Sequence, residues 1–354
     1  MTRFSLLGTL AAIGLSAGLA LGSDASAQSI QERLERNDRA VSEVRAAERE
    51  AQARSLLPIY STGSPGQNAR SGPRVVGGVD ASVPGAYEFT VRLEIQWGAS
   101  IGHCGGALVA PEIATVPGET KLYVREWETQ LQEQVWVVTA AHCVVDPDTG
   151  TVADPAGITV HGGERDRASP ERAIVKVTDV IPHHAYLATN LAHDIALLKL
   201  EPVDITDAKV RKMRPIRMPQ SKFIDDLYRL GARHVVNGWG RTSEGGFSSQ
   251  ILQTAVIPYG DQEQCKQDYA LAGAGIAPGS YCAGWRSGGI DSCEGDSGSS
   301  VFFHDQSVSP ISNRPILVGI VSWGIGCARP RLLGIYTNVL SYLGWIEREV
   351  AKSS

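Results

Sequence analysis

The chain has 354 residues, of which 43% are hydrophobic and 20% are charged, and its formal net charge is −5. This composition is typical of a globular protein and is sufficient for a large core. The negative charge and the lack of a basic stripe argue against nucleic acid as a main partner.

The first 27 residues have the pattern of a signal peptide. Arg3 gives a positive start, residues 4–21 are apolar or small, and Ala25-Ser26-Ala27 forms an A-x-A cleavage site. An uncleaved membrane anchor is the alternative, because the apolar run is nearly long enough to span a bilayer. Gly, Ser and Thr dilute the run, so we predict a secreted protein, extracellular or periplasmic, that keeps no membrane segment after signal cleavage.

Residues 28–74 are predicted to form a propeptide made of a charged helix and a flexible linker. The segment 28–57 carries acid–base pairs four residues apart, such as Glu32 with Arg36, and has only a thin apolar stripe. A coiled-coil or inhibitory role stays open, but the stripe is short and weak. Pro58 ends the helix, and residues 61–73 are rich in Gly, Pro and Ser, which is typical of a mobile, cleavable linker.

From residue 75 onward the sequence predicts an all-β domain. Short apolar or alternating runs are separated by Gly- and Pro-rich turns, and we expect strands at 89–95, 135–139, 173–180, 195–200, 234–239, 316–323 and 333–337. Only residues 342–352 have a helical pattern. A span of this length favours two small barrels over one.

Three segments have the residue types that nucleophilic catalysis needs. A serine hydroxyl requires a neutral imidazole to accept its proton and a buried carboxylate to orient that imidazole. Residues 136–143 read WVVTAAHC, residues 191–198 read LAHDIALL, and residues 291–300 read DSCEGDSGSS. Glycines around the serine allow the backbone to bend sharply and direct two N–H groups at one point.

These segments resemble the chymotrypsin–trypsin family. TAAHC, HDIALL and GDSG occur in that family's order, together with NGWG at 237–240 and SWGIGC at 322–327. The resemblance covers residues 75–354. It implies two six-stranded antiparallel β-barrels with a C-terminal helix, and the activity of a serine endopeptidase.

The resemblance also implies the catalytic roles. His142 would be the general base and then the general acid, and Asp194 would orient it. Ser297 would attack the scissile carbonyl to form an acyl-enzyme that water hydrolyses. The N–H groups of Gly295 and Ser297 would form the oxyanion hole.

The primary specificity pocket is implied by the same resemblance. Asp291, six residues before the nucleophile, would lie at its base and favour Arg or Lys before the cut bond. The other residues expected to bind substrate there are Ser292, Ser322, Trp323, Gly324 and Gly334. Leu191, Trp323 and Tyr269 would line upstream subsites, and Glu294 at the mouth would disfavour acidic substrates.

Residues 74–78 read RVVGG and resemble the family's activation site. Cleavage after Arg74 would free the amino group of Val75, which would turn inward and pair with Asp296. The chain would therefore be a zymogen that is nearly inactive until it is cut. Because the enzyme would itself cut after Arg, either another protease or the enzyme itself is expected to activate it.

The chain has six cysteines, all beyond residue 100, and an even count in an exported protein indicates disulfides. Spacing alone leaves many connectivities open, and the resemblance implies the pairs Cys104–Cys143, Cys265–Cys282 and Cys293–Cys327. We predict no metal and no cofactor, and we assign the other histidines, including His183, His184 and His193, to the surface. The expected partners of this monomer are protein or peptide substrates that contain Arg or Lys.

The chain departs from the family pattern in three places. Ser299-Ser300 replaces the usual Gly-Pro after the nucleophile loop, and residues 111–134 are an insertion that we interpret as a partner or regulatory surface. The segment 162–174 does not reproduce a calcium loop, although Glu164 and Glu171 are present. Two other hypotheses remain: a non-catalytic homologue that acts as a binding module, and an esterase on an unrelated fold.

Overall fold

The computed structural model describes residues 75–81, 88–110, 112–116, 119–123, 135–204, 206–219, 233–303 and 315–353. All of them belong to one compact unit, residues 57–354. The predicted signal peptide, propeptide and Arg74 lie outside the described residues. Within those ranges, no helix has the length and apolar character needed to cross a membrane.

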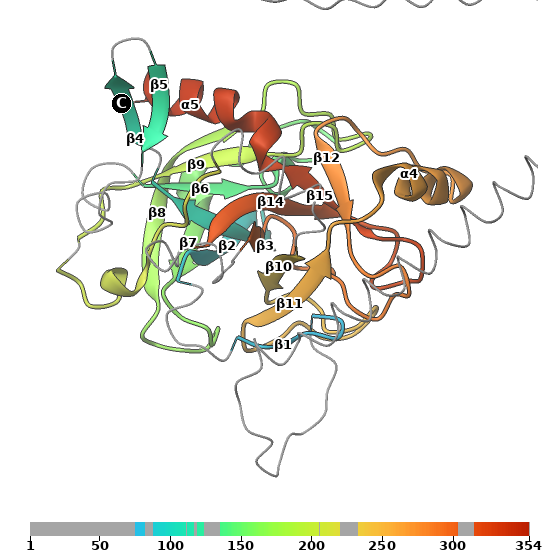
Figure 1. Cartoon of the computed structure of the whole chain (residues 1–354). Helices are drawn as coiled ribbons and strands as arrows, with labels where there is room; N and C mark the ends of the chain where they lie inside the picture. The colour runs from blue at the N-terminus through green and yellow to red at the C-terminus, as the bar shows by residue number, and fades with distance from the viewer. Residues whose placement is uncertain are drawn as a thin grey trace, which may run out of the picture. The chain divides into compact units, whose positions relative to one another are not determined.

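The first half of this unit is a closed antiparallel barrel (Figure 1). Its strands follow the order β2-β3-β6-β9-β8-β7 around the barrel. They are β2 (Thr90–Trp97), β3 (Ser100–Val109), β6 (Trp136–Thr139), β7 (Ile158–Gly162), β8 (Ala173–Pro182) and β9 (Ala196–Leu200). In β8 the buried positions alternate with exposed ones at Ala173, Val175 and Val177, as expected when one face lines a core. The prediction of a six-stranded barrel is confirmed for this half.

The second half is a seven-stranded antiparallel sheet, with the order β1-β11-β10-β13-β14-β15-β12. Its strands are β1 (Val79–Asp80), β10 (Arg233–Gly238), β11 (Gln253–Pro258), β12 (Ser280–Ala283), β13 (Ser300–Phe303), β14 (Ile316–Trp323) and β15 (Gly334–Asn338). Pairing among these strands does not close the sheet where the sequence predicts a second six-stranded barrel. An isolated bridge from Tyr259 to Ala283 nevertheless brings the edge strand β12 next to the end of β11.

The insertion at 111–134 contains a hairpin. Its strands β4 (Glu112–Val116) and β5 (Glu119–Tyr123) pair with each other in a separate two-stranded sheet. The remaining residues of the insertion lie outside the part of the chain that the structure describes.

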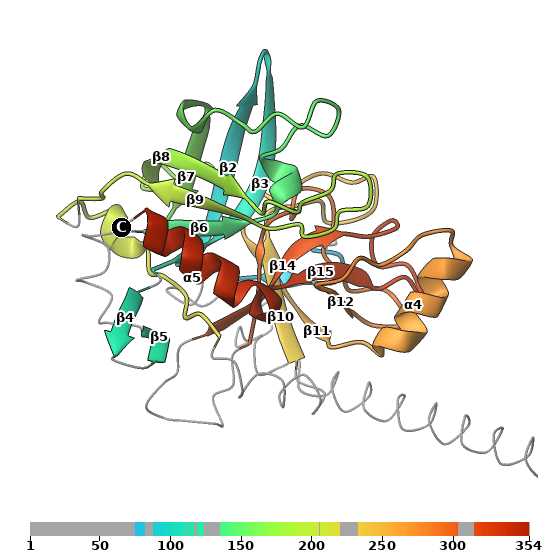
Figure 2. The ribbon, with the colours of Figure 1, turned by 90° about the horizontal axis from the view of Figure 1, so that it is seen from above.

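The expected C-terminal helix is present as α5 (Leu343–Lys352). Trp345, Ile346 and Val350 are buried in the same apolar cluster as the barrel strands. The Lys199 ammonium of β9 donates a 2.6 Å hydrogen bond to the carbonyl of Ser353. Both views place α5 alongside β6 and β9 (Figures 1 and 2).

The prediction that only the C-terminus is helical is wrong, because α4 (Gln262–Leu271) is a second helix. The Asp261 carboxylate caps it by accepting a hydrogen bond from the N–H of Gln264 at 3.0 Å. Only Cys265, Asp268 and Tyr269 of this helix are buried, so its sequence lacks the broad apolar stripe that signals a helix.

The surface assignment of the remaining histidines is also wrong in part. His161, His183 and His234 expose only 6%, 8% and 2% of their surface. The His183 ring is stacked against those of His184 and His193, with centroids 4.5 and 4.9 Å apart. Burial lowers the pKa of His183 to about 4 and that of His234 to about 3, so both are neutral parts of the core at pH 7.

The two halves share one core where they meet. The rings of Phe89 and Phe302 pack edge to face with centroids 5.1 Å apart. A buried chain of hydrogen bonds runs across the same junction: Ser300 Oγ donates to Asn237 Oδ1 at 2.8 Å, and Asn237 Nδ2 donates to Thr90 Oγ1 at 2.6 Å. Ser300 thus has a defined place in this packing, although it departs from the family pattern.

Candidate active site

His142 is held by a short helical turn at the end of a barrel strand. The chain leaves β6, and Ala141–Cys143 forms one 3₁₀ turn. The Cys104–Cys143 disulfide ties this turn to β3. The turn is therefore fixed both by its own backbone and by a covalent cross-link to the neighbouring strand.

Asp194, just before β9, holds both the ring and the backbone of His142. Its Oδ2 lies 2.8 Å from His142 Nδ1, and its Oδ1 accepts the backbone N–H of His142 at 2.9 Å. Burial alone would raise the pKa of this carboxyl, which is 1% exposed, but the His142 charge and hydrogen bonds lower it overall. Burial lowers the pKa of His142, but the charge of Asp194 and its hydrogen bond together raise it overall.

The hydroxyl of Ser322 is a third partner of this pair. It donates to Asp194 Oδ2 at 2.5 Å, from a position 128 residues away in the chain. The sequence predicts Ser322 only as a substrate-binding residue, because no local pattern indicates a contact between β14 and the segment before β9. Only the packing of the sheet against the barrel brings the two residues together.

Ser297 lies in a tight turn that only glycines permit. Gly295 and Gly298 have φ angles of 91° and 77°, and a Cβ on Gly298 would lie 2.2 Å from Thr139 Oγ1. The carbonyl of Ser297 accepts the N–H of Gly105 at 2.7 Å. The turn that carries Ser297 is thereby attached to strand β3 of the barrel.

His142 and Ser297 line the same cavity, which has a volume of about 300 Å³. The cavity also contains the expected pocket residues Asp291, Ser292, Ser322, Trp323, Gly324 and Gly334, together with Leu191 and Glu294. Tyr269, expected to line a subsite, does not reach it. Its ring is fully buried, packs edge to face on Trp323 at 5.2 Å, and donates its hydroxyl to the Leu333 carbonyl.

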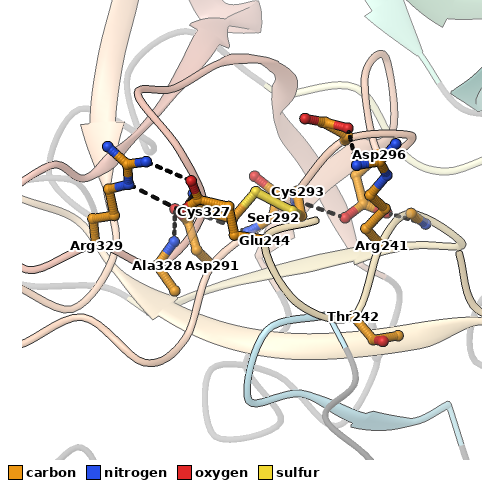
Figure 3. The surroundings of a disulfide bond; sticks show 12 residues. Arg241, Thr242, Glu244, Asp291, Ser292, Cys293, Asp296, Cys327, Ala328 and Arg329 are labelled. Atoms are coloured by element: carbon orange, nitrogen blue, oxygen red, sulfur yellow. Dashed lines mark hydrogen bonds and ion pairs between the residues drawn. A yellow bond between two sulfur atoms is a disulfide. The ribbon is translucent and has the colours of Figure 1, made fainter. Parts of the chain in front are cut away.

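Asp291 is a buried carboxylate in the wall of this cavity, with 4% of its surface exposed. It accepts hydrogen bonds from the N–H of Ser292 at 2.9 Å and the N–H of Ala328 at 3.1 Å (Figure 3). It also accepts one from the hydroxyl of Tyr336 at 3.2 Å. Burial raises its pKa to about 7 although these donors lower it. A Cβ on Gly334 would lie 2.7 Å from its Oδ1, so that glycine leaves the carboxylate accessible from the cavity.

Asp296, next to Ser297, is completely buried. Its oxygens accept the N–H groups of Cys293 at 2.9 Å and Gly240 at 2.7 Å, and burial raises its pKa to about 7. No cation among the residues that the structure describes pairs with it. Val75 is also buried, and the carbonyl of Val76 accepts the N–H of Asp291 at 3.1 Å.

The cysteines form the three pairs that the resemblance implies. They are Cys104–Cys143, Cys265–Cys282 and Cys293–Cys327. Cys104, His142 and Cys143 are the only described acidic, histidine or cysteine residues grouped closely enough to hold an ion. Both sulfurs belong to one disulfide, so this group offers no thiolate ligand.

Two acidic residues of the segment 162–174 lie beside a lysine from a later part of the chain. The Lys212 ammonium lies 2.7 Å from Glu164 Oε1 and 4.0 Å from Glu171 Oε2. A lysine ammonium thus lies beside both of the carboxylates that the sequence analysis singled out in this segment.

Comparison with known proteins agrees with this architecture. The sequence matches the family model described as Trypsin over residues 127–346. It is 30% identical over 296 residues to Trypsin eta of Drosophila melanogaster, covering 83% of this chain and 93% of that protein. It is also 30% identical over 301 residues to Trypsin eta of Drosophila erecta, covering 84% of this chain and 98% of that relative. The chain therefore belongs to the trypsin family of serine proteases.

Proposed function

We propose that this serine protease is a secreted endopeptidase that cleaves peptide bonds after Arg or Lys with His142, Asp194 and Ser297 as its triad. The observation that carries the proposal is Asp291. It is a buried carboxylate in the cavity lined by His142 and Ser297, and it accepts three hydrogen bonds from uncharged donors. No Lys, Arg or His side chain among the described residues forms an ion pair with it.

The proposed chemistry uses residues that line this cavity or contact its lining. His142 accepts the proton of Ser297 as the hydroxyl attacks the scissile carbonyl, and the buried Asp194 stabilises the resulting imidazolium. His142 then returns the proton to the leaving amine, and water hydrolyses the acyl-enzyme. Among described residues, the N–H groups of Gly295 and Ser297 donate no hydrogen bond, which supports their role as oxyanion donors.

The same carboxylate supplies the specificity. A substrate guanidinium or ammonium entering the cavity would replace its hydration with an ion pair to Asp291, and the substrate charge would stabilise the ionised carboxylate. Ser292 lies beside it, and Gly324 adds no side chain that would narrow the cavity. The backbone of 322–324 is available to pair with the substrate as an added strand.

Activation is the second part of the proposal. Residues 1–27 act as a signal peptide and residues 28–74 as a propeptide. Cleavage after Arg74 then frees the Val75 amine to pair with Asp296. Asp296 supports this role because it is buried, has a raised pKa and lacks a described cation. Three disulfides are compatible with an oxidising compartment outside the cell or in the periplasm. The mature monomer needs no cofactor.

The test is hydrolysis of matched Arg, Lys, Phe and Ala peptide amides before and after trypsin cuts the purified protein at Arg74. We expect strong cleavage of the Arg and Lys amides only after the cut, and none by Ser297→Ala treated in the same way. Sequencing of the new N-terminus would check that it is Val75. No hydrolysis of any substrate by correctly cut protein would support the alternative of a binding module. Membership of the trypsin family excludes the alternative of an esterase on an unrelated fold. Hydrolysis of simple esters alone would contradict the proposed endopeptidase activity.

A further inference from the structure

Residues 241–248 form a hairpin beside the nucleophile turn, which we call the bracing hairpin. Arg241 and Ser248 form an antiparallel bridge at its base. The N–H of Thr242 donates to the carbonyl of Phe247 at 3.2 Å. Because these bonds fix the base of the hairpin, its side chains can hold neighbouring segments in place.

The base of the bracing hairpin is attached to the residue after Cys293. The backbone N–H of Arg241 donates to the carbonyl of Glu294 at 2.7 Å, and its guanidinium lies 2.7 Å from the Glu294 carboxylate. Glu294 is one of the residues that line the cavity. One end of the hairpin is therefore attached to the wall of the proposed specificity pocket.

The tip of the hairpin contacts the segment after Cys327 through Glu244 (Figure 3). Glu244 Oε2 accepts Arg329 Nε at 2.9 Å and the N–H of Cys327 at 3.4 Å, and Arg329 Nη2 donates to Glu244 Oε1. The guanidinium thus binds the carboxylate with two parallel hydrogen bonds, a geometry that fixes direction as well as distance. These bonds lower the pKa of Glu244, and the carboxylate raises the pKa of Arg329.

Ala328 lies between the two residues that Glu244 holds. It has a φ of 55°, a left-handed conformation that is uncommon for alanine and has to be maintained by its surroundings. In this conformation its N–H donates to Asp291 Oδ2 at 3.1 Å. The disulfide Cys293–Cys327 holds one side of this residue, and Arg329 bound to Glu244 holds the other.

We propose that Glu244 is a positioning residue for the specificity pocket: through Arg329 and the N–H of Cys327 it holds Ala328 in the backbone conformation that directs its N–H at Asp291. This inference rests on the proposed role of Asp291 in binding a substrate cation. It assigns a contribution to substrate binding to a side chain that itself touches no substrate.

A second ion-pair cluster holds the same wall but is less suited to a test. Asp268 of α4, only 4% exposed, pairs with Arg286 at 2.6 Å and Arg331 at 2.8 Å. Asp268 is a poor site for a test, because replacing a buried carboxylate that has two ion-pair partners would destabilise the fold. Side chains of Glu244 and Arg329 are 44% and 50% exposed, so replacing either should change the wall locally and leave the core intact.

The experiment uses the cut, active protein and two readouts: KM and kcat for Arg and Ala peptide amides, and the inhibition constant of an arylamidinium cation, which probes the pocket without chemistry. For Glu244→Gln and for Arg329→Ala we expect the KM for Arg amides and the inhibition constant to rise about two- to five-fold. We expect kcat and the KM for Ala amides to stay unchanged. Glu263→Gln, which removes an ion pair with Lys266 between two exposed side chains on α4, is the matched control and should leave every value unchanged.

Charge reversal provides the decisive comparison. Glu244→Arg should raise the KM for Arg amides and the inhibition constant further, because it places two like charges together. Glu244→Arg combined with Arg329→Glu should restore both constants toward the wild-type values. Unchanged inhibition constants in Glu244→Arg, or equal losses on Arg and Ala amides, would overturn the proposal. If the wild-type protein cleaved no Arg amide, the proposed function would fail instead, and these two failures are distinguishable because the second appears before any variant is made.

Discussion

Buried carboxylates on the barrel side and on the sheet side of the candidate active site have pKa values shifted in opposite directions. On the barrel side, Asp194 is almost completely buried, yet its pKa is lowered because His142 and the hydroxyl of Ser322 lie against it. On the sheet side, Asp291 and Asp296 are equally buried, and burial raises the pKa of each to about 7. Their described partners are backbone N–H groups and neutral side chains.

The difference shows which cation is available to pair with each carboxylate. Burying an unpaired carboxylate is unfavourable, so a carboxylate that lacks a cation within its own fold binds one strongly when it arrives. Under the proposed function, Asp194 has an internal cation whenever His142 is protonated during catalysis. Under the proposed function, Asp291 receives its cation from the substrate and Asp296 receives one from the new N-terminus.

The largest effect is expected on the barrel side. Asp194→Asn should lower kcat for Arg amides by about 10⁴-fold, because an amide cannot stabilise the imidazolium and holds the wrong tautomer of His142. Steady-state kinetics on the cut protein measures this effect. Asp148→Asn, an exposed aspartate in a turn after His142, is the control and should retain full activity. A loss of less than about ten-fold in Asp194→Asn would contradict the assigned triad.

Replacement of Asp291 should have a smaller and more selective effect. Asp291→Asn should lower kcat/KM for Arg and Lys amides by about 10²- to 10³-fold, because the substrate cation would be buried without a counter-charge. Hydrolysis of Ala amides should be nearly unchanged, since that side chain needs no charge partner. Ser292→Ala is a useful neighbouring control, expected to change the same constants only slightly. Equal losses on charged and neutral substrates would show that Asp291 supports the structure and does not select the substrate.

In the cut wild-type enzyme, the pH dependence of kcat/KM should distinguish ionisation of Asp291 on the sheet side from ionisation of His142 on the barrel side. The charge of Asp291 appears as pH rises through about 7, so the ratio of kcat/KM for Arg amides to that for Ala amides should increase about ten-fold between pH 6 and pH 8. Ionisation of His142 affects both substrates and cancels in the ratio. The pH profile of kcat for Arg amides should lack this rise near pH 7, because the bound substrate cation keeps the Asp291 carboxylate ionised. A ratio independent of pH would contradict the unpaired state of Asp291.

The smallest effect is expected at carboxylates that, like Asp194, have their own cation. Lys212→Met should lower the free energy of unfolding by only about 0.5 kcal/mol, because its pairs with Glu164 and Glu171 are partly exposed. In the wild-type protein, millimolar calcium should leave the melting temperature unchanged because Lys212 already lies between these carboxylates. Thermal unfolding with calcium and with a chelator measures both effects. A clear rise of the melting temperature in calcium would show that the ion displaces Lys212.

Elements with a strong local pattern were predictable, and elements held by distant contacts were not. The apolar runs before His142 and after Asp194 predicted β6 and β9 closely, since a buried strand needs apolar side chains in succession. The helix α4 was missed because a cap at Asp261 and three buried residues stabilise it without an apolar stripe. The buried position of His183 was missed because two of the rings that pack against it, His193 and Trp345, come from other segments of the chain.

By itself, the sequence determined the family, one barrel, the C-terminal helix and the residues expected to perform the chemistry. Motifs do this because catalysis requires particular side chains next to particular turns, such as Ser297 beside Gly295 and Gly298. Only the tertiary structure decided which buried groups share a partner. The hydroxyl of Ser322 on Asp194, the N–H of Ala328 on Asp291 and the ammonium of Lys212 on Glu164 join segments far apart in the chain. Burial and pairing, which decide the charge of a carboxylate, depend on that packing and not on neighbours in sequence.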